Sequence, residues 1–106
     1  MSLRIIIIAA IALFLSGVPA FAAEHVVDQK DLAFSVDALT VAVGDTIKFT
    51  NSDRTTHHIW TSDNGLNVSS PALKPGDSYS VKLVKAGTYT FQCHIHPKMK
   101  IVVTVQ

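Results

Sequence analysis

Four possible metal ligands fall within seven residues near the end of the chain, in the stretch Gln92–Met99, which reads QCHIHPKM. Its cysteine, Cys93, is the only one in the sequence. Thiolate and thioether sulfur are soft ligands and imidazole is borderline, so this mixture favours copper over a hard ion such as calcium or magnesium. The stretch still lacks one strong ligand. The fold must therefore bring a distant side chain to this loop.

Two adjacent histidines upstream, His57 and His58, can supply that ligand. One of them, together with Cys93, His96 and Met99, gives the donor set of a blue copper site, with two imidazoles and a thiolate near a plane and a weak axial methionine. A histidine pair alone is more often structural. For the loop alone, a metal site is favoured, and the alternative is a buried thiol beside a packed methionine. The combination of the two segments favours a metal site.

The first residues have the features of a targeting segment rather than of a folded domain. Arg4 precedes an uninterrupted apolar run, Ile5–Leu15, and the small-x-small sequence Ala20-Phe21-Ala22 fits a cleavage site. We expect residues 1–22 to be a secretory signal peptide and residues 23–106 to be an exported, periplasmic domain. An uncleaved anchor is the alternative, although the run is short for a bilayer. After cleavage we expect no stable membrane association.

Composition excludes some classes of partner. Without Arg4, the chain has equal numbers of basic and acidic residues, so no basic field is available for nucleic acid or an anionic membrane. A domain this small buries only about 60% of its unfolded surface and often needs a disulfide or a metal. One cysteine cannot form an internal disulfide, and a metal bond explains an unpaired thiol in an exported chain. We expect a monomer.

Short β-rich runs separated by turn sequences fill the rest of the chain. Alternation of apolar and polar residues is clear in several, and it places Cys93 on the inward face after Tyr89 and Phe91. The pattern predicts an all-β fold, an antiparallel Greek-key β-sandwich or barrel of about seven to eight strands. The expected strands are Leu32–Val36, Leu39–Val43, Thr46–Thr50, His57–Thr61, Ser78–Val84, Thr88–Cys93 and Ile101–Val105.

The mixed polar segment that precedes these runs contains His25. We interpret His25 as a solvated histidine close to the new amino terminus. The alternative is an accessory ligand, because a free terminal amine and His25 together could chelate copper.

From about Leu32 to Val105 the chain resembles the cupredoxins, the small blue copper proteins. The motifs that carry the resemblance follow the family's order: Val43-Gly44-Asp45, a strand ending in Asn51, a histidine, a Pro-Gly-Asp turn, Gly87-Thr88-Tyr89 and the ligand loop. The spacing Cys-x-x-His-x-x-Met looks most like the short loop of amicyanin-type members of the plastocyanin, pseudoazurin and amicyanin group. The resemblance implies that His57, Cys93, His96 and Met99 hold one type 1 copper ion.

One departure from the family's pattern lies beside the site. The residue after the first histidine is often an asparagine in cupredoxins, and its side chain ties that loop to the residue after the cysteine. Here these two positions are His58 and His94. Two facing imidazoles can hydrogen-bond, titrate or bind a second metal.

The function that the resemblance implies is single-electron transfer, with copper cycling between Cu(II) and Cu(I). Redox protein partners are expected to dock near His96, over an apolar rim to which Leu66, Pro71 and Ala72 contribute. No coordination position is left open for a substrate, so we expect no enzyme activity. The alternative is a periplasmic copper-handling protein, a chaperone, buffer or resistance factor, which His25, His58 and His94 keep in consideration.

Overall fold

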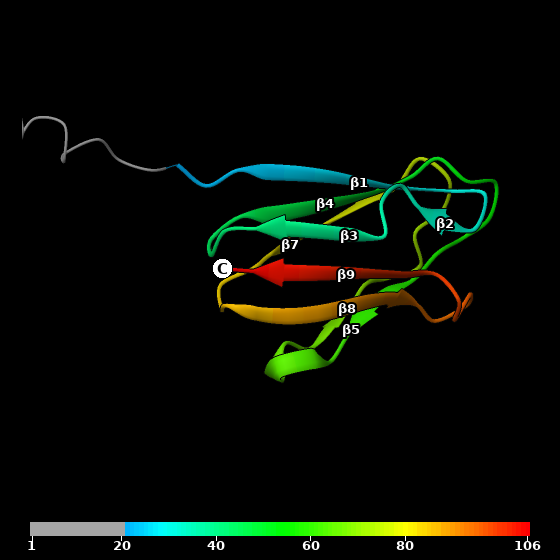
Figure 1. The fold of residues 1–106 in the computed structure, drawn as a ribbon. Coiled ribbons are helices and arrows are strands. Elements are labelled where there is room, and N and C mark those ends of the chain that lie inside the picture. The colour runs from blue at the N-terminus through cyan, green and yellow to red at the C-terminus, as the bar shows by residue number, and fades with distance from the viewer. Residues whose placement is uncertain (1–20) are drawn as a thin grey trace, which may run out of the picture.

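The computed structural model describes residues 21–106, so most of the predicted signal peptide lies outside the described residues. Two β-sheets pack face to face and enclose the core (Figure 1). Among residues 21–106, no helix has the length and the apolar character needed to cross a membrane. The elements in chain order are β1 (Glu24–Lys30), β2 (Ala33–Phe34), β3 (Ala38–Val41), β4 (Thr46–Asn51), β5 (Ile59–Thr61), the 3-10 helix η1 (Asp63–Gly65), β6 (Val68–Ser69), β7 (Ser78–Lys82), β8 (Gly87–Cys93) and β9 (Lys100–Val105).

The first sheet has the strand order β2-β1-β4-β7 and the second has the order β3-β9-β8-β5-β6. The all-β sandwich that the sequence predicts is confirmed. The expectation of a wholly antiparallel arrangement is wrong at two places, since β1 pairs with β4 and β3 pairs with β9 in parallel. Both exceptions arise because consecutive strands, such as β3 and β4, are in different sheets.

The alternating runs form the core, as their period of two predicts. Ile47 and Phe49 on β4 are fully buried, and so are Phe91 and Cys93 on β8. The rings of Phe49 and Phe91 meet between the two sheets with centroids 5.4 Å apart. Cys93 therefore ends a core strand on its inward face, which confirms its predicted position.

Sequence analysis did not predict strand β1. β1 lies between β2 and β4, although its sequence reads as a polar segment. Its fully buried inward positions are Val27 and Gln29, and a buried glutamine hides the apolar period. The strand expected at Leu32–Val36 shortens to two residues, because Asp31 and Leu32 adopt positive φ angles of 54° and 60° and form a turn.

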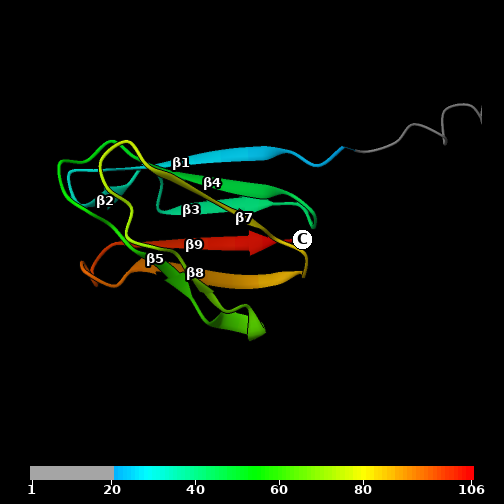
Figure 2. The same cartoon turned by 180° about the vertical axis from the view of Figure 1, so that it is seen from behind.

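Three segments meet at one end of the sandwich: the turn from β1 to β2, the loop from β4 to β5 and the loop from β8 to β9. They share that end in both views (Figures 1 and 2). The C-terminus and the beginning of β1 lie at the opposite end (Figure 2). The predicted ligands are at the first end, with Cys93 as the last residue of β8 and the others on the loops.

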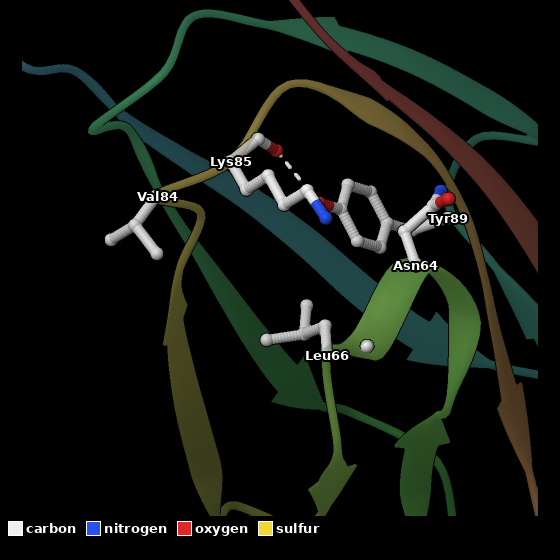
Figure 3. A pocket seen from close by; sticks show the side chains of 6 residues that line it. Asn64, Leu66, Val84, Lys85 and Tyr89 are labelled. Atoms are coloured by element: carbon white, nitrogen blue, oxygen red, sulfur yellow. Dashed lines mark hydrogen bonds between the residues drawn. The ribbon is translucent and has the colours of Figure 1, made fainter.

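A hollow of about 140 Å³ lies near the beginning of β8, at the other end of this strand from Cys93 (Figure 3). Its walls are held by two hydrogen bonds. The Tyr89 hydroxyl donates to the Lys85 carbonyl at 2.7 Å, and the Asn64 amide donates to the Thr88 carbonyl at 2.6 Å. Leu66 lines this hollow, so its expected place on a rim near His96 is wrong.

Candidate metal centre

Three of the four predicted ligands converge. The ligating atoms of His57, Cys93 and His96 all lie within 4.8 Å of one another. Cys93 Sγ is 3.6 Å from His57 Nδ1 and 3.7 Å from His96 Nδ1. A metal with bonds of about 2.3 Å to sulfur and 2.0 Å to nitrogen, as in zinc sites, separates such donors by about 3.7 Å at an angle of 120°. The observed spacing therefore fits one ion in a trigonal set of donors.

Met99 belongs to the same loop and is buried, with 2% of its surface exposed. It joins the core cluster that also contains Cys93. Its backbone N–H donates to the His96 carbonyl at 2.9 Å, which closes the ligand loop into a turn. A thioether buried here suits the weak axial position of a blue copper site.

Backbone hydrogen bonds fasten the two ligand segments to each other. Ile59 is paired with Cys93 in the register of β5 and β8. Just before that pair, the His58 N–H points at Cys93 Sγ at 3.3 Å, and the His94 N–H donates to the His58 carbonyl at 3.1 Å. An N–H group aimed at the sulfur stabilises the thiolate and is one of the features that tune a copper potential.

His57 is fully buried and is held from two sides. Its backbone N–H and C=O both pair with Leu73, at 3.0 and 2.7 Å. Its ring Nε2–H donates to Asp53 Oδ2 at 3.0 Å, which leaves Nδ1 free to face Cys93. A carboxylate that holds the far nitrogen of a ligating imidazole fixes both its tautomer and its orientation.

Asp53 was not identified from the sequence, although its place four residues before His57 was the available signal. Two hydrogen bonds, first from the Leu32 N–H and then from the His57 ring, hold the pKa of Asp53 at about 2, below its usual 3.8. Asp53 therefore stays ionised and available to His57 across the neutral range. The same carboxylate also connects the turn between β1 and β2 to the site.

His96 is the most accessible of the three converging ligands and is half-buried. It contributes to a hollow of about 420 Å³ whose lining is mostly apolar. Leu32 and Ile95 beside it are each 52% exposed. The hollow is lined by Leu32, Ile95, His96, Pro97, Lys98 and Met99.

The two histidines that depart from the family's pattern do lie next to each other. The rings of His58 and His94 have centroids 4.9 Å apart in an edge-to-face arrangement. Each also has another neighbour: His58 Nε2 is 3.1 Å from Ser69 Oγ, and His94 stacks on Trp60 at 4.7 Å with an interplanar angle of 12°. The backbone bonds between the two loops thus do the fastening.

His25 is at the opposite end of the sandwich from this centre. It belongs to β1, opposite Ile47 on β4, and its Nε2 is 2.9 Å from Asp45 Oδ2. The interpretation of His25 as a solvated terminal histidine is therefore wrong, because the ring is engaged by a buried carboxylate.

Comparison with known proteins shows to which family the chain belongs. The sequence profile described as a cupredoxin-like domain matches residues 4–105. The chain belongs to the cupredoxin family. Family membership and the convergence of His57, Cys93 and His96 together make type 1 copper the cofactor of this cupredoxin.

Relatives of this cupredoxin include the amicyanin of Paracoccus denitrificans, at 31% identity over 76% of this chain and 64% of the relative. The plastocyanin of Prochlorothrix hollandica is 31% identical over 97% of this chain and 87% of its own length. This cupredoxin thus spans less than two thirds of the amicyanin but most of that plastocyanin.

Solved structures agree with the sequence relatives. A Cu(I) structure of an amicyanin variant matches with a TM-score of 0.73 and 29% identity, over 86% of this cupredoxin and 88% of that chain. A purple cupredoxin from Nitrosopumilus maritimus has a TM-score of 0.69 and 28% identity, and the match covers 77% of this chain and 99% of that chain. The copper-containing nitrite reductase of Thermus scotoductus SA-01 also matches, at 26% identity and a TM-score of 0.73, but over only 24% of its length. The likeness to that enzyme is confined to one part of it.

Proposed function

We propose that this cupredoxin is an exported single-electron carrier in which His57, Cys93, His96 and Met99 are the copper ligands. When bound, copper supplies a one-electron couple between Cu(II) and Cu(I). The observation that carries the proposal is the convergence of Cys93 Sγ with two imidazole Nδ1 atoms, at 3.6 and 3.7 Å, at one end of the β-sandwich.

Rigidity of the donors is what electron transfer requires, since a site that barely moves between oxidation states exchanges electrons quickly. His57 and Cys93 are buried, and Asp53 and Leu73 fix the position of His57. The N–H groups of His58 and His94 hold the two ligand segments together.

His96 is the proposed point of exchange with redox protein partners. It is the half-buried ligand, and it opens into the apolar hollow that Leu32, Ile95 and Pro97 line. An apolar surface around an exposed ligand suits brief docking, for which small interfaces are usual. No nucleic acid is expected among the partners, and the chain is proposed to act as a monomer.

Export is the second part of the proposal, with residues 1–22 as a signal peptide and residues 23–106 as a periplasmic domain. β1 begins at Glu24, the second residue after the proposed cleavage point. Removal of residues 1–22 therefore leaves both described sheets and the whole core cluster intact.

Copper handling is the second candidate function. The observation that favours it is the exposed His94 beside His58, next to the copper ligands, with Ser69 and Trp60 around them. A handling protein gives its copper to a partner or chelator, whereas a carrier retains copper through many redox cycles.

Spectroelectrochemistry of the copper-loaded protein separates these functions. The carrier proposal predicts a reversible one-electron wave, with the visible band bleached on reduction and fully recovered on oxidation over repeated cycles. The matched control is His94→Ala, which removes an exposed ring while leaving the four proposed ligands. Loss of copper during each reduction in the wild type, prevented in this variant, would favour handling instead.

A further inference from the structure

One buried carboxylate holds two nitrogen atoms at the beginning of the folded chain. Asp45 Oδ1 accepts a hydrogen bond from the Ala23 backbone nitrogen at 2.9 Å, and Oδ2 lies 2.9 Å from His25 Nε2. The Ala42 N–H also donates to Oδ2, at 3.0 Å. Asp45 is 6% exposed, and its contacts with Ala23 and His25 are partly buried.

The sheet continues this arrangement. The Thr46 N–H donates to the Ala23 carbonyl at 3.0 Å, and the register of β1 with β4 then places Glu24 opposite Thr46 and His25 opposite Ile47. The chain is therefore held in an extended form from Ala23 onward. All of this lies at the opposite end of the sandwich from Cys93.

Ala23 is also the residue that the proposed signal cleavage exposes. Hydrolysis of the peptide bond after Ala22 consumes one water, leaves a carboxylate on the released peptide and creates an ammonium group on Ala23. The new terminus reads Ala23-Glu24-His25, with a histidine in third position. A free amine, the two following amide nitrogens and the imidazole can surround Cu(II) in the square-planar nitrogen geometry that this ion prefers. Binding there releases one ammonium proton and two amide protons.

The chelate and the folded strand exclude each other. Wrapping around an ion requires the amine and the His25 ring to leave Asp45, and requires the first residues of β1 to leave β4. We propose that the processed amino terminus is a latent second copper(II) site, and that Asp45 keeps it closed by binding both of its terminal nitrogen groups.

This inference depends on the export proposed above but not on the copper centre at Cys93. Hydrogen bonds, first from the Ala23 backbone and then from the His25 ring, hold the pKa of Asp45 at about 2, below its usual 3.8. Asp45 therefore stays ionised at neutral pH. In the wild type, copper(II) is directed to the Cys93 centre because the amino terminus is occupied by Asp45.

The test begins with the full chain, expressed for export in a bacterial host. Mass spectrometry of the purified protein identifies its first residue, and the proposal requires Ala23. Wild type and Asp45→Asn are then titrated with Cu(II) against a competing chelator and followed by EPR and visible absorption. Asp45→Asn should bind the second copper about tenfold or more tightly than wild type. The second ion should show the EPR signal of a square-planar nitrogen site without a thiolate band.

Two further variants make the comparison specific. Adding His25→Ala to Asp45→Asn should abolish the second site, and Asp37→Asn, at an exposed residue, should behave as wild type. A first residue other than Ala23, or equal affinity for the second copper in wild type and Asp45→Asn, would overturn the proposal. The blue band of the first equivalent reports the Cys93 centre separately, so a failure there is recognised independently.

A measurement on the wild type applies even when Asp45→Asn does not fold. NMR titration of the Ala23 amine should show a pKa raised above that of an ordinary terminal amine, because Asp45 stabilises the ammonium form. The other charged or titratable groups nearby are Glu24 and His25 on β1 and, opposite Thr46, Lys82 on β7. An ordinary amine pKa would refute the contact with Asp45.

Discussion

Asn51 is the residue whose removal most directly tests how the scaffold positions the first copper ligand. It ends β4 and is 2% exposed. Its side-chain amide donates to the carbonyls of Thr55 and Leu73 at 3.0 and 2.9 Å, and its side-chain carbonyl accepts from the Asp53 N–H at 2.9 Å. These three bonds join the segment that carries Asp53 to the residue that pairs with His57.

Replacing Asn51 with alanine removes all three bonds. The Leu73 carbonyl keeps only the bond from the His57 N–H. At about 0.5–1.5 kcal/mol net for each, the loss in the free energy of unfolding should be about 3 kcal/mol. For a domain of this size, that corresponds to a fall in melting temperature of about 12–24 °C. Urea denaturation of the metal-free and copper-loaded protein measures the change. Because copper binds the folded state and stabilises it, the unfolding transition of the copper-loaded variant can still be measured.

The matched control is Asn67→Ala, because Asn67 is an exposed asparagine. It should change the free energy of unfolding by less than about 0.5 kcal/mol. Asn51→Ala should also weaken copper binding, since the position of His57 depends on the segments that Asn51 joins. A destabilisation by Asn51→Ala no larger than that of Asn67→Ala would refute the assigned role of these three bonds.

Three other outcomes are expected. Cys93→Ala should abolish the intense visible band of the copper complex, because that band arises from charge transfer from the thiolate to copper, and absorption spectroscopy would expose a persisting band. Met99→Leu should retain copper but raise the reduction potential measured by voltammetry, since a weak axial donor is lost; complete loss of copper would contradict an axial role. The native pKa of Asp45, about 2, lies below its usual 3.8, so its contribution to stability is complete above about pH 4 and lost as the pH falls toward 2. Urea denaturation should therefore show a flatter acid dependence for Asp45→Asn than for wild type, and equal slopes would argue against this contribution.

The parts that sequence analysis predicted are those with a short-range signal. Alternation along Tyr89, Phe91 and Cys93 has the period of a half-buried strand, and the structure places all three inward. The spacing within the ligand loop brings His96 close to Cys93 because both are on one short turn. His57 required the family's motif order, since nothing local distinguishes it from His58.

The parts that sequence analysis missed depend on pairings between distant residues. β1 has a buried Gln29 in place of an apolar residue, so its period is hidden until β4 lies beside it. The partnership of His25 with Asp45 joins residues 20 positions apart. Asp53 lies only four residues before His57, but its carboxylate is also held by the Leu32 N–H, 21 positions away in the chain. Such contacts have no periodic or compositional signature.

The most direct test of the copper centre is a Cu(II) titration of the exported protein, followed by visible absorption and EPR. The proposed set of His57, Cys93, His96 and Met99 predicts an intense coloured band that is complete at the first equivalent of copper, with narrow hyperfine splitting. A nearly colourless first equivalent with wide splitting would place the ion elsewhere and contradict the proposed centre.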